Sequence, residues 1–149
     1  GLSVAAAAAA FGVPVVLIEK GAMGGDCLNT GCVPSKAMIA SGKRAQAMRE
    51  ATPFGIAAVD PQVNFRKVHD HVRGVIDGIA PIDSVERFQA MGVKVIQAAA
   101  RFEDPSTIIV GENRIQARRF VIATGSRPAV RRYRGSRTCP ITPTRPSSA

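Results

Sequence analysis

Residues Gly24–Lys36 read "GGDCLNTGCVPSK" and set two cysteines five positions apart after a pair of glycines. Side chains at that spacing lie too far round a regular helix to bond, so we expect Cys27 in a loop and Cys32 near the start of the next helix. The unpaired N–H groups of a helix N-terminus favour a thiolate, and Pro34 suits a first helical turn. The stretch therefore predicts a pair of reactive thiols.

Two kinds of metal site compete with this interpretation. A structural zinc site needs four ligands, and the two histidines, His69 and His71, stand two positions apart on an expected helix and do not share a face. An iron–sulfur cluster needs about four cysteines, whereas the chain has 3. We predict no metal site.

The segments before and after the cysteines predict an α/β layered domain. The alanine-rich run "LSVAAAAAAFG" predicts a helix over 2–12, and the apolar run "VPVVLIE" predicts a buried strand over 13–19. Helical spacing continues over 37–51 and over 65–92, where Pro81 is expected to break the helix.

The last third of the chain changes to short β-branched runs separated by turn residues. These runs predict a small β-meander and a final strand, from the segments 93–97, 107–110, 114–116 and 118–125. Helix, strand, cysteine stretch, helices and then strands together favour a fold with a parallel sheet.

Composition and charge exclude several classes of protein. The chain has 149 residues, 46% of them hydrophobic, which suits one domain or part of one. Its net charge of +9 is concentrated at the end, where 131–149 holds five arginines and no acid, so the remaining 15 basic and 11 acidic residues leave an ordinary surface. We therefore expect no nucleic-acid partner.

The uncharged beginning of the chain does not predict a membrane segment. Gly12 and Pro14 interrupt it well short of the ~20 residues that a spanning helix needs, and no basic residues precede it as in a signal peptide. Few cysteines, two of them close together, favour reactive thiols in a reducing compartment. We expect a soluble, cytoplasmic protein with no membrane partner.

A dinucleotide-binding pattern is partly present at the start. Gly1 opens the first expected helix and Glu19 ends the first expected strand, which is the spacing of a Rossmann-like βαβ unit that lacks its first strand and its first two glycines. Any surface βαβ unit with an acid at a strand end would look the same.

The quoted stretch resembles the redox-active disulfide signature of the class I pyridine nucleotide–disulfide oxidoreductases. "VVLIEKG" resembles the second strand of that family's FAD domain, and "RRFVIATGSRP" resembles the segment where its chain meets the flavin again. The resemblance covers residues 1 to about 130 and implies a truncated Rossmann-like FAD-binding domain.

The resemblance also implies roles for the residues of the motif. Cys27 would be the interchange thiol that attacks the substrate, Cys32 would be the charge-transfer thiolate against the flavin, and Lys36 would approach the flavin N5 edge. The cofactor-binding residues by position would be Gly1, Glu19, Lys20, Gly24, Gly25, Asp26, Lys36, Ala98, Ala123, Thr124 and Gly125. Ala98 replaces the usual glycine of its segment.

Asp26 stands where many relatives have threonine or valine. An acid next to the interchange cysteine is expected to raise the pKa of the Cys27 thiol by repulsion between like charges.

The resulting prediction is an N-terminal fragment of an FAD-dependent disulfide oxidoreductase of the dihydrolipoamide dehydrogenase or mercuric reductase type. The complete enzyme would use FAD and NAD(P), act on a thiol, a disulfide or Hg(II), and form a homodimer. We expect the fragment alone to be inactive and to retain FAD weakly or not at all.

Two alternatives remain open, namely a non-catalytic thiol or soft-metal-binding module and a nonfunctional gene remnant. Residues 1–130 would be the partial FAD domain, and 131–149 an aberrant basic tail that is disordered or follows a frameshift near Val130.

Overall fold

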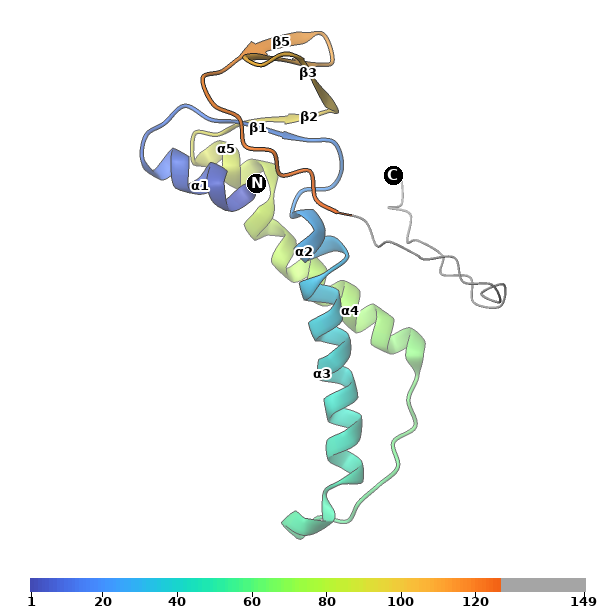
Figure 1. Ribbon diagram of the computed structural model, residues 1–149. Helices are drawn as coiled ribbons and strands as arrows, with labels where there is room; N and C mark the ends of the chain where they lie inside the picture. The colour runs from blue at the N-terminus through green and yellow to red at the C-terminus, as the bar shows by residue number, and fades with distance from the viewer. Residues whose placement is uncertain (127–149) are drawn as a thin grey trace, which may run out of the picture.

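Two small sheets lie together at one end of the molecule, as the computed structural model in Figure 1 shows. The structure describes residues 1–126. Strands β1 (Val16–Glu19) and β2 (Lys94–Gln97) pair in parallel, and their register sets Glu19 opposite Gln97. The second sheet is an antiparallel meander in the order β3 (Ala100–Asp104), β4 (Thr107–Val110) and β5 (Asn113–Gln116). The predicted combination of a parallel sheet and a β-meander is confirmed.

Helices α1 (Leu2–Ala10) and α5 (Val85–Ala90) cover the parallel pair on the side away from the meander (Figure 1). The core there is built on Phe88, which is 1% exposed and packs with the buried Ala5 and Val93. Burying one such aromatic side chain stabilises a fold by roughly 1.5–3 kcal/mol. Helix α1 packs against this core, and its small alanine side chains let it lie close to Phe88.

The remaining helices form an arm that extends away from the sheets (Figure 1). Helix α4 packs against α3 and crosses it near α2, and the chain turns at the far end of the arm (Figure 1). At that end Arg49 Nε lies 2.7 Å from Asp60 Oδ1. The chain then returns to the start of α4, where Asn64 Oδ1 accepts the Lys67 N–H at 3.2 Å as the N-cap. The elements of the arm are α2 (Gly25–Asn29), α3 (Cys32–Arg49), η1 (Thr52–Phe54), α4 (Phe65–Ile79) and η2 (Ala80–Asp83).

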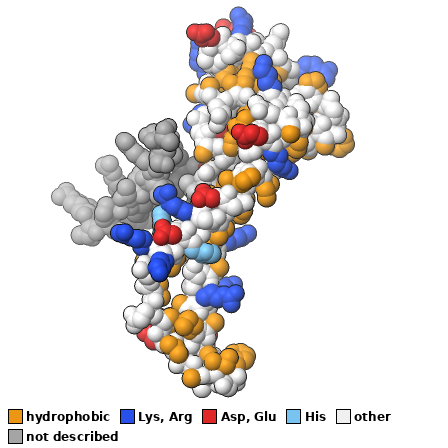
Figure 2. Space-filling view, turned by 180° about the vertical axis from the view of Figure 1, so that it is seen from behind, with side chains coloured by type: hydrophobic (Ala, Val, Ile, Leu, Met, Phe, Trp, Pro, Cys, Tyr) orange, Lys and Arg blue, Asp and Glu red, His pale blue; other side chains and the backbone are white. Residues whose placement is uncertain are grey.

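The far end of the arm also exposes apolar side chains, and Figure 2 shows hydrophobic groups gathered there. Phe54 is 81% exposed and Ile56 is 62% exposed. Within residues 1–126, no helix is both long and apolar enough to cross a membrane.

Most predicted elements are confirmed, with three corrections. The break near Pro81 is present, as η2 between α4 and α5. Cys27 does not lie in a loop, because the glycine pair starts the short helix α2 around it. The sequence did not indicate β3 as a strand, although it forms the first edge of the meander.

The predicted strand over 118–125 is also wrong. A strand needs a hydrogen-bonded neighbour, and within the described part of the chain residues 118–125 have none. Residues 117–126, here called the returning segment, instead run as irregular chain from the meander back past the start of α1 toward α2 (Figure 1). The predicted tail over 131–149 lies outside the described residues.

Candidate functional site

Two cysteines stand on successive helices, one inside α2 and one as the first residue of α3. Both thiols are free and exposed. The prediction that Cys32 starts a helix is confirmed, with Gly31 at its N-cap and the Ser35 N–H bonded to the Gly31 carbonyl at 3.1 Å. Cys32 therefore lies where unpaired backbone N–H groups favour a thiolate.

The first glycine of the motif allows the tight start of α2. Gly24 has φ 96°, in the left-handed region, and a Cβ there would come within 2.7 Å of the Cβ of Leu28. Leu28 is 3% exposed and anchors α2 in the protein. The side-chain amide of Asn29 donates to the carbonyls of Met23 and Gly25 at 3.0 Å and 2.9 Å, which closes the turn before the helix.

The link between the two cysteines is fixed through the carbonyl of Asp26. The Thr30 N–H and hydroxyl both donate to it, at 3.0 Å and 3.3 Å. A Cβ on Gly31 would lie 2.9 Å from the same carbonyl oxygen, closer than real Cβ contacts come. Sequence reasoning gave no role to Leu28, Asn29, Thr30 or Gly31, although all four lie inside the quoted motif.

The thiol of Cys32 raises the pKa of Cys27, first through a side-chain hydrogen bond. Partial desolvation and repulsion by a charge on Cys32 act in the same direction, whereas the positive charge of Lys36 lowers this pKa. The protonation of the Cys27 thiol therefore depends on the neighbouring Cys32 thiol.

The predicted direction of the Cys27 shift is confirmed, but the predicted cause is wrong. Asp26 is not among the groups that shift this pKa. Its carboxylate accepts the backbone N–H of Ser126 at 3.0 Å and therefore faces the returning segment.

Three predicted cofactor residues lie at the carboxyl end of the parallel strands. Glu19 ends β1 opposite Gln97, so Lys20 and Ala98 follow at the same edge. Glu19 Oε1 accepts the Gly21 N–H at 2.7 Å. The carboxyl edge of a parallel sheet is where α/β proteins of this kind bind their ligands.

The start of α1 and the returning segment meet near this edge (Figure 1). A Cβ on Gly1 would lie 3.4 Å from the Cβ of Ala123. Gly125 has φ 72°, and a Cβ there would lie 2.9 Å from Asp26 Oδ2. The structure thus brings Gly1, Ala123–Gly125 and the start of α2 together, whereas Lys36 is an exposed residue one turn into α3.

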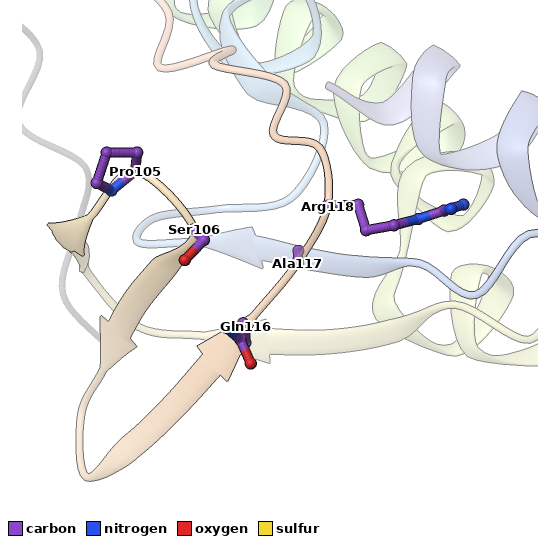
Figure 3. Close-up of a pocket in the computed structure, with 5 residues that line it drawn as sticks. All are labelled: Pro105, Ser106, Gln116, Ala117 and Arg118. Carbon is purple, nitrogen blue, oxygen red and sulfur yellow. The ribbon is translucent and has the colours of Figure 1, made fainter.

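One hollow lies apart from this arrangement. A shallow hollow of about 420 Å³ is lined by the five residues of Figure 3, which are Pro105, Ser106, Gln116, Ala117 and Arg118. None of them is a predicted site residue. Within residues 1–126, no three His, Cys, Asp or Glu side chains converge as a metal site would require.

Two free thiols, one inside α2 and one at the start of α3, form the kind of dithiol arrangement that thiol–disulfide redox proteins use. The sequence matches the family of pyridine nucleotide–disulphide oxidoreductases over residues 1–143. The chain belongs to that family.

Relatives of known name support this assignment. The dihydrolipoyl dehydrogenase of Haloferax volcanii is 37% identical over 135 residues, which are 85% of this chain and 28% of that protein. The Bacillus subtilis dihydrolipoyl dehydrogenase is 35% identical, over 86% of this chain and 28% of its own length. A Staphylococcus aureus mercuric reductase is 31% identical, over 80% of this chain and 22% of its own length. The chain thus spans about a quarter of the length of these relatives.

A solved structure shares the fold. It is the Cu(II) complex of an HOCl-induced flavoprotein disulfide reductase from Escherichia coli, and it superposes with a TM-score of 0.70 at 22% identity over 88% of this chain and 27% of that one. The predicted α/β fold of a flavoprotein disulfide reductase is therefore confirmed for the described residues.

Proposed function

We propose that this chain provides the redox-active disulfide and part of the FAD site of a flavin-dependent disulfide oxidoreductase. The observation that carries the proposal is the placement of two free thiols on successive helices, Cys27 inside α2 and Cys32 at the start of α3. Oxidation would join the two sulfur atoms by one S–S bond and release two protons and two electrons. Reduction by a substrate dithiol, or by electrons from a nicotinamide, would reverse this step.

The residues at the carboxyl edge of the parallel sheet fit an FAD. The first turn of α1 starts at Gly1 without a side-chain cap, so its backbone N–H groups are free for a phosphate. The glycines at 24, 25 and 125 all have positive φ and present backbone without a side chain. When bound, FAD would supply a two-electron acceptor and donor between a nicotinamide and the cysteine pair.

The remaining predicted residues would hold this cofactor from the other sides. Glu19 would accept hydrogen bonds from the ribose hydroxyls, with Lys20 and the Ala98 backbone at the same edge. Lys36 would hold positive charge near the cysteines and the reduced ring, which is consistent with its effect on the pKa of Cys27. Thr124 would border the flavin from the returning segment.

The substrate class follows from the dithiol. A nucleophilic thiol attacks a disulfide, and a thiolate pair also binds a soft ion, so the substrate would be a thiol, a disulfide or Hg(II). The names of the relatives, dihydrolipoyl dehydrogenase and mercuric reductase, cover both chemistries. We propose NAD(P) and a homodimer for the complete enzyme only.

The test is disulfide formation in the chain with Cys139 replaced by serine, which leaves Cys27 and Cys32 as its cysteines. Incubation with oxidised glutathione followed by alkylation should give a product that lacks two hydrogens and takes up no alkyl group. Cys27→Ser and Cys32→Ser should each instead give a mixed disulfide with glutathione. Uptake of two glutathiones or two alkyl groups by the Cys139→Ser chain would refute the proposal.

A further inference from the structure

Asp26 joins the cysteine motif to a segment that is distant in the sequence. Its backbone belongs to α2, next to Cys27. Its carbonyl accepts two hydrogen bonds from Thr30, in the link to Cys32. Its carboxylate accepts the Ser126 N–H at 3.0 Å, 100 positions further along the chain. Asp26 therefore connects α2, the link that follows it and the returning segment.

The carboxylate of Asp26 makes no cap for its own helix. An acid in a first helical turn often bonds to the free N–H groups there. In α2 the N-cap is Gly24 and no side-chain cap hydrogen bond forms. The Asp26 carboxylate is thus engaged with the returning segment and not with α2.

The conformation of the returning segment matches this contact. Gly125 has φ 72°, which side chains rarely adopt, and a Cβ at 125 would approach Asp26 Oδ2 to 2.9 Å and Oδ1 to 3.3 Å. Any other residue would therefore push the carboxylate away from the Ser126 amide. The lack of a side chain at 125 and the acid at 26 serve the same contact.

Few other interactions hold the returning segment. The Ala117 N–H bonds to the Ser106 carbonyl at 3.0 Å where the segment leaves the meander, and the Phe120 ring meets the Phe102 ring edge-on at 5.1 Å. Among residues 1–126, the bond to Asp26 is the hydrogen bond that ties the end of the segment to the helices.

We propose that Asp26 is a positioning residue that clamps the returning segment to the cysteine-bearing helix α2, so that the placement of Cys27 depends on the placement of that segment. The proposal rests on the proposed function, because the returning segment carries Ala123, Thr124 and Gly125 of the FAD site. Asp26 acts through its hydrogen bond to Ser126 and takes no part in electron transfer.

The experiment compares Asp26→Ala and Asp26→Asn in the Cys139→Ser chain. Asparagine keeps an oxygen that accepts the Ser126 N–H but removes the charge, whereas alanine removes both. Asp60→Ala is the matched control, since it removes the same charge at the far end of the arm. Two quantities are measured: hydrogen exchange of the Ser126 amide by NMR, and the rate at which iodoacetamide alkylates Cys27 in the reduced protein at fixed pH.

A clamp predicts that Asp26→Ala speeds exchange of the Ser126 amide about five-fold, as expected for the loss of one hydrogen bond. The alkylation rate of Cys27 should change in the same variant. Asp26→Asn and Asp60→Ala should stay close to the parent in both quantities. Gly125→Ala should also speed Ser126 exchange, because the added Cβ meets the Asp26 carboxylate and alanine rarely adopts a φ of 72°.

Two results would overturn the clamp. Unchanged Ser126 exchange in Asp26→Ala would mean that the hydrogen bond does not hold the segment. Equal changes in Cys27 alkylation for the alanine and asparagine variants would mean that the charge of Asp26 affects the reactivity of Cys27 and that its hydrogen bond to Ser126 does not. The proposed function fails separately, when the parent forms no Cys27–Cys32 disulfide although Ser126 exchange follows the predicted pattern.

Discussion

Gly31→Ala is the sharpest test of the geometry that holds the two cysteines together. Its φ of −117° lies outside the left-handed region that favours glycine, so the space around the added Cβ can be considered first. The added Cβ would lie 2.9 Å from the Asp26 carbonyl oxygen and 3.6 Å from the Cα of Cys27. Since the atoms it meets belong to the backbone, α2 must move relative to α3.

The expected cost follows from two effects. Overpacking of this kind costs about 1–3 kcal/mol, and movement of the Asp26 carbonyl weakens the hydrogen bonds that Thr30 donates to it, each worth about 1 kcal/mol. We expect the free energy of unfolding to fall by about 2 kcal/mol. If about half of that loss falls on the relative placement of the thiols, the Cys27–Cys32 disulfide becomes about five-fold less favoured.

The assay pairs urea unfolding with a glutathione redox titration. Gly42→Ala is the matched control, because a Cβ at Gly42 in α3 meets nothing within 4 Å and alanine stabilises a helix over glycine by about 0.5–1 kcal/mol. The control should raise stability and leave the redox midpoint unchanged. If Gly31→Ala has the same stability and the same redox midpoint as the parent, then the contact between Gly31 and Asp26 does not set the cysteine geometry.

Three further predictions concern the thiols and the core. In Cys32→Ser the alkylation midpoint of Cys27 should move to lower pH, because the Cys32 side chain is the first cause that raises the pKa of Cys27, ahead of desolvation; an unmoved pH–rate profile would contradict this. Lys36→Gln should move the alkylation midpoint of Cys27 to higher pH, because it removes a positive charge that lowers the pKa of Cys27. This shift should be smaller than that of Cys32→Ser, since Lys36 is the smaller cause, and a shift to lower pH would contradict the prediction. Phe88→Ala should lower the free energy of unfolding by about 3–5 kcal/mol, measured in urea, since this side chain is 1% exposed at the centre of the core.

The sequence predicted those elements whose pattern is local. The alanine-rich α1, the strand β1 and the break near Pro81 each depend on residue types that are adjacent in the chain. The strand over 118–125 was predicted wrongly for the converse reason. Its β-branched run has strand propensity, but Val121 and Ile122 are 64% and 74% exposed and find no neighbouring strand among the described residues.

The dithiol was predictable because one continuous motif contains both cysteines and the residues that set their spacing. The role of Asp26 was not, because adjacency to Cys27 suggested repulsion of the thiolate. The structure instead turns its carboxylate toward Ser126. The partner stands 100 positions away, and only the path of the chain past α1 brings it to the motif.

The same contact explains why an acid can stand next to the interchange cysteine at all. An exposed carboxylate beside a thiolate would disfavour the charged thiol by repulsion. The Asp26 carboxylate accepts the Ser126 amide N–H, and the pKa of Cys27 is raised by Cys32 and desolvation against the lowering effect of Lys36. A residue at 26 that keeps the hydrogen-bond acceptor but has no charge should therefore preserve both the placement of the returning segment and the reactivity of Cys27. Asparagine is such a residue, whereas alanine removes the acceptor and the charge together.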